Sequence, residues 1–193
     1  MSITNKYKGL VKLDTLDLPS PEFYTITNKK DIFNHSLSYS YYGWTIRTCR
    51  YSGYNEYNLY NAHNLSRNEL KEKLLERYNK GYFKNKFHII YKSWRFKYSI
   101  NILFADLNYH VEVCRGTPKK LTMGRSNPDT KISIPFGSLQ DIKIIKMDNN
   151  PKILPYVKKI YYYLYKINWE SFSAEIAIKN NENIIFYDLI KIR

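Results

Sequence analysis

The sequence has 193 residues and a formal net charge of +14, from 31 Lys and Arg against 17 Asp and Glu. Hydrophobic residues make up 44% of the chain, which favours one compact domain over a disordered chain. No run approaches the roughly 18 apolar residues of a membrane helix, and the first residues lack a signal-peptide pattern. We therefore expect a cytoplasmic protein without a membrane partner. Cys49 and Cys114 lie far apart and indicate neither a zinc site nor a disulfide scaffold.

The charge and the 20 tyrosines allow two interpretations. Lys and Arg neutralise phosphates and aromatic rings stack on bases, a combination typical of nucleic-acid-binding proteins. An AT-rich coding sequence also raises Lys, Asn, Ile and Tyr together. Basic and aromatic residues alternate most densely at residues 84–98, but no RNP motif, zinc pattern or basic heptad region accompanies them. A nucleic acid or another polyanion is therefore an open possibility as a partner.

The first half of the chain predicts short strands and two helices. A Pro-rich turn leads into a β-prone run at residues 23–27. Asn28 is a suitable N-cap for a short helix, and residues 44–50 form a pattern typical of a strand. Ser66, with Glu69 three positions later, forms a capping box that begins a clear amphipathic helix.

The second half predicts three strands, a loop, the longest helix and two final strands. Residues 116–138 are rich in Gly and Pro and predict a loop with one short strand. Pro151 stands at a first helical position, and the apolar stripe after it predicts a core contact. The strands lie at residues 87–92, 99–104, 109–115, 171–178 and 183–190. Together these elements predict an α+β protein, mostly antiparallel sheet, with about three helices.

Four segments carry a family resemblance. They are residues 16–27, residues 44–50, the stretch 99–129 with its two glycines and an Asn-Pro-Asp tripeptide, and the paired strands 172–178 and 184–190. In this order they resemble the amino-terminal nucleotide-binding domain of phosphoenolpyruvate synthase and pyruvate phosphate dikinase, which has the ATP-grasp fold. The resemblance implies one domain over residues 1–193, with approximate lobes 1–92 and 93–193, and ATP and Mg²⁺ as cofactors.

The resemblance also implies phosphate-binding residues. Arg47 falls on the family's strand arginine and would contact the phosphates and act in catalysis, since a guanidinium makes two charge-assisted bonds to one phosphate. Gly116 and Gly124 keep the family's glycine spacing, and glycines let backbone amides approach phosphate oxygens. Lys119 stands where the family has an acidic residue, and Lys119 and Lys92 are further candidate phosphate ligands, although loop lysines are commonly only solvated.

Glu175 and Asp188 fall on the family's two magnesium-binding positions. A hairpin at residues 180–183 would place their strands side by side, and alternation along each strand could put both carboxylates on one face. Mg²⁺ prefers oxygen ligands and usually takes one or two carboxylates plus phosphates. Ile190 stands where the family has an arginine, which counts against full activity.

Two functions from different classes follow. The first is an ATP- and Mg²⁺-binding protein, either an ATP-dependent phosphotransferase or ligase with an unknown acceptor, or a degenerate nucleotide binder. The second is a basic, aromatic-rich protein that binds single-stranded nucleic acid without catalysis. The sequence leaves the acceptor and the oligomeric state open.

Overall fold

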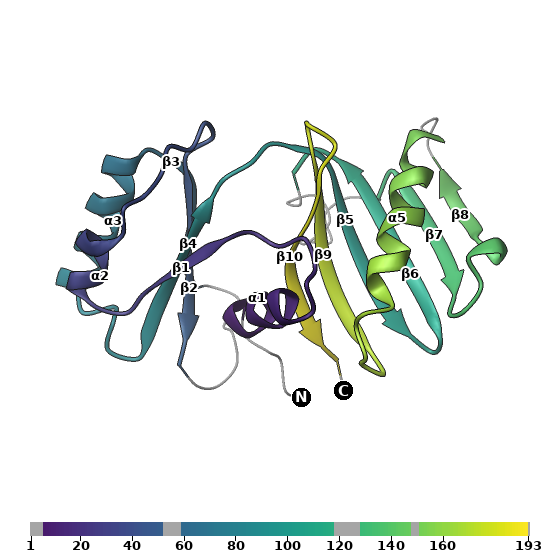
Figure 1. Ribbon diagram of the computed structural model, residues 1–193, viewed down its shortest axis with the longest axis horizontal. Helices are drawn as coiled ribbons and strands as arrows, with labels where there is room; N and C mark the ends of the chain where they lie inside the picture. Colours follow the sequence, from purple (N-terminus) through teal and green to yellow (C-terminus); the bar gives the residue numbers. More distant parts are fainter. Residues whose placement is uncertain (1–5, 52–58, 118–127, 148–150, 193) are drawn as a thin grey trace. The chain divides into compact units, whose positions relative to one another are not determined.

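The computed structural model describes residues 6–51, 59–117, 128–147 and 151–192 (Figure 1). Their contacts divide them into two compact units. Unit 1 holds residues 8–20 and 95–192, and unit 2 holds residues 6–7 and 21–94. The division falls two residues after the expected lobe boundary, and unit 1 also includes an amino-terminal segment. Each unit contains one antiparallel sheet with helices, which confirms the predicted α+β class.

Unit 2 is built on a four-stranded antiparallel sheet in the order β1-β4-β2-β3. Trp44 and Ile46 of the sheet pack in one apolar cluster with Leu70 and Leu74 of a helix, so the helices cover one face of this sheet. The elements of unit 2 are β1 (Phe23–Ile26), α2 (Lys29–Asn34), β2 (Trp44–Arg50), β3 (Asn61–Leu65), α3 (Arg67–Asn79) and β4 (Lys86–Lys92).

Both predicted helix caps in unit 2 are confirmed. The Asn28 side chain accepts from two backbone amides at the start of α2, and the Ser66 side chain accepts from the Glu69 amide at the start of α3. Each cap satisfies amides that have no partner within the helix.

Unit 1 is built on a six-stranded antiparallel sheet in the order β10-β9-β5-β6-β7-β8. Short 3₁₀ turns at Leu139–Asp141 and Pro151–Ile153 precede β8 and the last helix, so that helix begins after the predicted Pro151. It has 11 residues and α3 has 13, so the prediction that it is the longest helix is wrong. The remaining elements are α1 (Lys6–Thr15), β5 (Phe96–Ala105), β6 (Asn108–Arg115), β7 (Thr130–Pro135), β8 (Lys143–Met147), α5 (Leu154–Leu164), β9 (Phe172–Lys179) and β10 (Ile184–Lys191).

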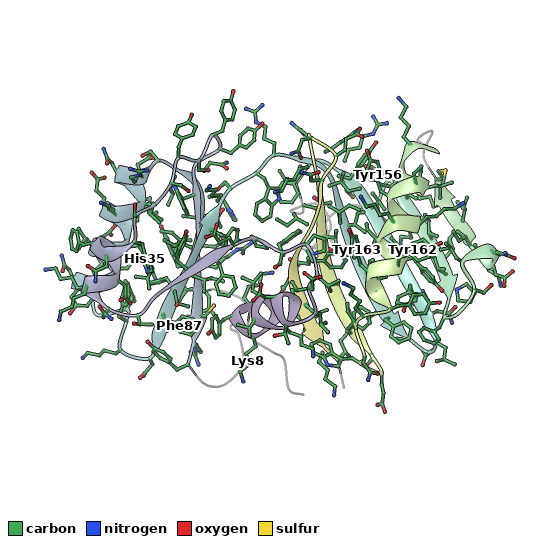
Figure 2. All side chains as sticks on the ribbon, viewed as in Figure 1. Lys8, His35, Phe87, Tyr156, Tyr162 and Tyr163 are labelled. Carbon is green, nitrogen blue, oxygen red and sulfur yellow. The ribbon has the colours of Figure 1, made fainter. Side chains whose placement is uncertain are left out.

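α5 covers one face of the six-stranded sheet (Figure 1). The ring of Tyr161 in α5 packs edge to face on Tyr109 of β6, with ring centroids 5.5 Å apart. The ring of Tyr163 packs on Phe186 of β10, with centroids 5.9 Å apart. Tyr162, between them in the sequence, is 67% exposed (Figure 2). The apolar stripe therefore makes the core contact that the sequence predicts.

Three elements are absent from the sequence prediction. β3 and β8 are edge strands whose side chains are mostly exposed, so they lack the apolar alternation that marks a strand. α1 has a glycine in mid-helix and buries only Gly9, Leu10 and Leu13, so its sequence pattern is weak. With α1, the described part of the chain holds four α-helices instead of about three.

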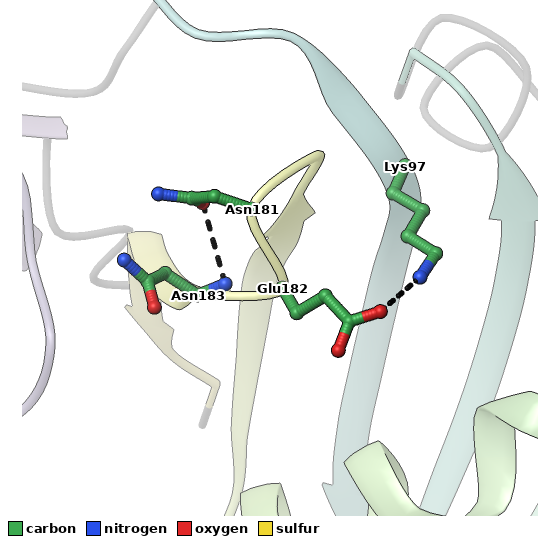
Figure 3. Close-up of polar contacts among 4 residues, drawn as sticks. All are labelled: Lys97, Asn181, Glu182 and Asn183. Carbon is green, nitrogen blue, oxygen red and sulfur yellow. Dashed lines mark hydrogen bonds and ion pairs between the residues drawn. The ribbon is translucent and has the colours of Figure 1, made fainter.

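The predicted hairpin between β9 and β10 is confirmed (Figure 3). Its turn is closed by the Lys179 amide, which donates to the carbonyl of Asn183 at 2.9 Å. Lys97 of β5 ties the turn to the neighbouring strand through an ion pair of 2.5 Å with Glu182. The hairpin therefore places β9 and β10 side by side in a fixed register.

Among the described helices, none is both long and apolar enough to cross a membrane.

Candidate functional site

The six-stranded sheet of unit 1 has one face toward α5 and one face away from it. Tyr98 of β5 meets Tyr156 of α5 with ring centroids 6.4 Å apart, so from Tyr98 onward, past the irregularity that follows Phe96, the even-numbered side chains of β5 point toward the helix. Because side chains alternate along a strand, Asn101 and the other odd-numbered residues between Ser99 and Ala105 point to the opposite face. That face carries the predicted metal ligands.

A continuous row of polar residues crosses this face on all six strands, and we call it the polar row. Each member is the direct cross-strand partner of the next, and such partners share a face with Cβ atoms about 4.5–5.5 Å apart. From β10 to β8 the polar row consists of Asp188, Glu175, Asn101, Glu112, Lys131 and Lys146.

A β-bulge in β10 places Asp188 in the polar row. Phe186 of β10 is paired with Ile176 of β9. The neighbouring residue of β9, Glu175, is paired with Asp188, because the ladder skips Tyr187. A bulge of this kind changes which side chain points to a given face. The structure therefore brings the two predicted metal ligands, Glu175 and Asp188, directly opposite each other.

The Asp188 carboxylate is held in a buried position, with the residue only 4% exposed. The backbone amide of Leu189 donates to its Oδ1 at 3.0 Å. α1 lies close by, since a Cβ atom added to Gly9 would be 3.3 Å from the same Oδ1. Glu175, beside it, is partly buried. Removing two neighbouring carboxylates from water costs free energy, and a cation close to them offsets this cost.

Asn101 contributes a third oxygen next to Glu175. Its Oδ1 atom is buried and has no hydrogen-bond partner in the described part of the protein. A buried acceptor without a partner costs about 1–3 kcal/mol. The described residues contain no group of three His, Cys, Asp or Glu placed to hold a metal ion, so the carboxylate pair needs other oxygens to complete a site. Two carboxylates and one amide oxygen fit the preference of Mg²⁺ for hard oxygen ligands.

The far end of the polar row is basic. Lys131 Nζ lies 3.2 Å from Glu112 Oε1, and Lys146 Nζ donates to the backbone carbonyl of Pro128 at 2.9 Å. The row thus changes from carboxylates on β10 and β9 to lysines on β7 and β8.

Arg47 and Lys92 lie on opposite faces of the sheet of unit 2. Lys92 is paired with Trp44, whose side chain belongs to the helix-covered face. Arg47 is on the other face, where its Nε donates to the Tyr91 hydroxyl at 3.4 Å. Tyr91 in turn stacks on Trp94 with centroids 5.5 Å apart. The structure therefore brings Arg47 next to Tyr91, and does not bring it next to Lys92.

Gly116 has a positive φ of 80°, which suits glycine at the end of β6. Its amide donates to the carbonyl of Lys97 at 3.1 Å, so this single donor already has an acceptor within the protein. The other candidates from the same stretch, Lys119 and Gly124, lie outside the described residues.

Asn101 is the candidate that sequence reasoning missed. The available signal is a single amide in an otherwise apolar run, Ile100 to Phe104. Its significance depends on Glu175, which lies opposite it on a strand that is distant in the sequence.

Comparison with known proteins identifies the fold. No protein-family model matches the sequence, and no curated protein matches it. Among solved structures, L-amino acid ligase from Bacillus licheniformis superposes with a TM-score of 0.56 at 14% identity, over 96% of this chain and 42% of that chain. N5-carboxyaminoimidazole synthetase from Staphylococcus aureus, complexed with ADP, gives a TM-score of 0.55 at 12% identity, over 98% of this chain and 45% of that chain. The chain has an ATP-grasp-like fold.

A third ATP-grasp structure extends the comparison. Carboxyaminoimidazole ribonucleotide synthase from Aspergillus clavatus, complexed with ATP, gives a TM-score of 0.55 at 9% identity, over all of this chain and 46% of that chain. The ATP-grasp-like chain therefore spans less than half the length of each of these three structures. At such low identity the similarity establishes the fold alone.

Proposed function

We propose that this ATP-grasp-like chain binds ATP together with Mg²⁺, and that Glu175 and Asp188 hold the metal ion. The observation that carries this proposal is the bulge that places Asp188 opposite Glu175 on the face away from α5. Two of the similar structures are complexes with ADP or ATP, which supports a nucleotide as the ligand. A bound Mg²⁺ would neutralise phosphate charge, which is its usual contribution to phosphoryl transfer.

The protein's own groups would position the nucleotide. Glu175 and Asp188 would fix the metal ion, and Arg47 stays our candidate for a charge-assisted contact with a phosphate. The similar structures are named as a ligase, a synthetase and a synthase, which favours a ligase over a simple phosphotransferase. The finer resemblance to phosphoenolpyruvate synthase and pyruvate phosphate dikinase rests on the four sequence segments. The acceptor of the phosphoryl group is left open by this proposal.

Thermal unfolding with and without Mg-ATP tests the proposal. A ligand that binds only the folded protein raises the melting temperature, so we expect a shift with Mg-ATP and a smaller one with ATP plus EDTA. The variants Glu175→Gln and Asp188→Asn should remove the magnesium-dependent part, and Arg47→Gln should weaken the response to ATP. Glu170→Gln, which changes an exposed carboxylate of unit 1, is the matched control. No shift with any nucleoside triphosphate and magnesium contradicts the proposal.

The alternative of a single-stranded nucleic-acid-binding protein gains no support from the structure. It needs exposed rings in the segment 84–98, yet Phe87, Tyr91 and Tyr98 are only 3–6% exposed, and Trp94 and Phe96 are partly buried. Three of the five rings therefore pack inside the protein, where they cannot stack on bases.

A further inference from the structure

We infer that Asn101 is the third protein ligand of the magnesium ion, with its side-chain oxygen completing the set begun by Glu175 and Asp188. This inference rests on the proposed function, because it concerns the same metal ion. It goes beyond that function by assigning a role to a residue on β5, a strand that carries neither of the two carboxylates.

The register places Asn101 correctly for this role. Asn101 is the cross-strand partner of Glu175, and Glu175 is the partner of Asp188. The three side chains therefore project from one face, each next to its neighbour, on three adjacent strands. One ion in front of Glu175 can be reached by oxygens from both sides.

Among the residues that the structure describes, the cross-strand neighbours of Asn101 are carboxylates, and no group donates a hydrogen bond to its oxygen. Its neighbours across the ladder are Glu175 on one side and Glu112 on the other, and a carboxylate only accepts. The nearest cation of the polar row, Lys131, is paired with Glu112. On the same strand, Ser99 donates to the carbonyl of Gly116.

A cation explains why an amide oxygen is kept in this position. The oxygen is buried without a partner in the described structure, an arrangement that weakens folding unless something binds there. Violations of the rules of core packing are expected at functional sites. With the amide turned over, so that its nitrogen took the buried place, Asn101 would instead donate to Glu175, and substitutions separate these two cases.

Titration of Mn²⁺ as a substitute for Mg²⁺ tests the inference, with free Mn²⁺ measured by electron paramagnetic resonance in the presence of a non-hydrolysable ATP analogue. Asn101→Leu has nearly the same shape and no oxygen, and we expect it to weaken Mn²⁺ binding at least tenfold. Asn101→Asp keeps an oxygen in the same place and should bind Mn²⁺ at least as tightly as the unmodified protein.

Two further measurements keep the test decisive. Without metal, Asn101→Leu should melt at a higher temperature than the unmodified protein, because it removes a buried acceptor that has no partner. Leu103→Asn and Leu103→Asp place an amide or a charge two residues along the same face, where Leu103 is 41% exposed, and both should leave Mn²⁺ affinity unchanged. An equal gain in affinity from Leu103→Asp and Asn101→Asp would indicate a general charge effect and overturn the inference.

The outcomes distinguish this inference from the proposed function. Tight Mn²⁺ binding that is lost in Glu175→Gln but unchanged in Asn101→Leu leaves the proposed function standing and overturns the role of Asn101. Failure of Asn101→Asp to bind Mn²⁺ also overturns it, because a donor to Glu175 and not an oxygen ligand is then required. An unmodified protein that binds neither Mn²⁺ nor the analogue overturns both.

Discussion

His88 is a fully buried titratable side chain in unit 2. Its Nδ1 lies 3.0 Å from the Thr48 hydroxyl oxygen, and Arg77 Nε donates to its Nε2 at 3.4 Å. Because an arginine nitrogen only donates, Nε2 accepts and the ring proton is on Nδ1. Burial, with the charges of Arg77 and Lys86 nearby, lowers the pKa of His88 from 6.5 to about 3. The folded protein therefore holds a neutral imidazole.

We expect this histidine to make the protein less stable as the pH falls from 6.5 towards 3. In that range the exposed His88 imidazole of the unfolded state binds a proton, whereas the buried imidazole of the folded state stays neutral. Protonation therefore favours unfolding. One pH unit in this window corresponds to about 1.4 kcal/mol per group. Urea unfolding at several pH values measures the slope, and His88→Gln, which does not titrate, should show a shallower one. Parallel curves for the two proteins from pH 6.5 to 5 would contradict the prediction.

At the scale of elements, local contacts were predictable and tertiary ones were not. The caps at Asn28 and Ser66 follow from the sequence because the side chain and the amides it satisfies are at most three residues apart. The β9–β10 turn is local as well, because the Lys179 amide and the Asn183 carbonyl that close it are four residues apart. The bulge that brings Asp188 into the polar row depends on the partner strand, and the position of Asn101 depends on Glu175, so neither is readable from one segment.

α1 shows the same limit, because its place depends on β10. A Cβ atom on Gly9 would lie 2.6 Å from the backbone oxygen of Leu189, closer than side-chain carbons approach. A glycine in mid-helix lowers helical propensity, yet here it permits close packing between helix and strand. Gly9 therefore weakens the helical pattern in the sequence and also allows α1 to pack closely on β10.

We expect Gly9→Ala to lower the free energy of unfolding by about 1–3 kcal/mol, the usual cost of overpacking. The sign of this change in stability is informative, because at a solvent-exposed helix position alanine would raise stability by about 1 kcal/mol relative to glycine. Chemical denaturation followed by circular dichroism measures the change. Val11→Ala, at an exposed position of the same helix, is the control and should have little effect. A more stable Gly9→Ala variant would show that α1 does not pack closely on β10.

At the scale of the whole molecule, the charge is spread along the chain. Residues 21–94 carry 12 Lys and Arg against six Asp and Glu, and residues 95–193 carry 16 against nine. The lysines of the polar row are in part committed to Glu112 and to a backbone carbonyl. A spread positive charge attracts polyanions in general, because released counterions supply the free energy, but it does not create a site for bases.

We therefore expect a labelled single-stranded oligonucleotide to bind weakly and to be released by salt, whereas Mg-ATP binding should change little over the same range. The physical reason is the number of phosphates neutralised, which is large along an oligonucleotide and small for one nucleotide. Fluorescence anisotropy at about 50 and 300 mM KCl measures both affinities under conditions where counterion release separates them. Glu175→Gln should weaken Mg-ATP binding and leave oligonucleotide binding as it was, because in the proposed site this carboxylate contacts only the metal ion. An oligonucleotide that stays tightly bound at the higher salt and is displaced by Mg-ATP would instead place both ligands in one site and make nucleic acid the partner.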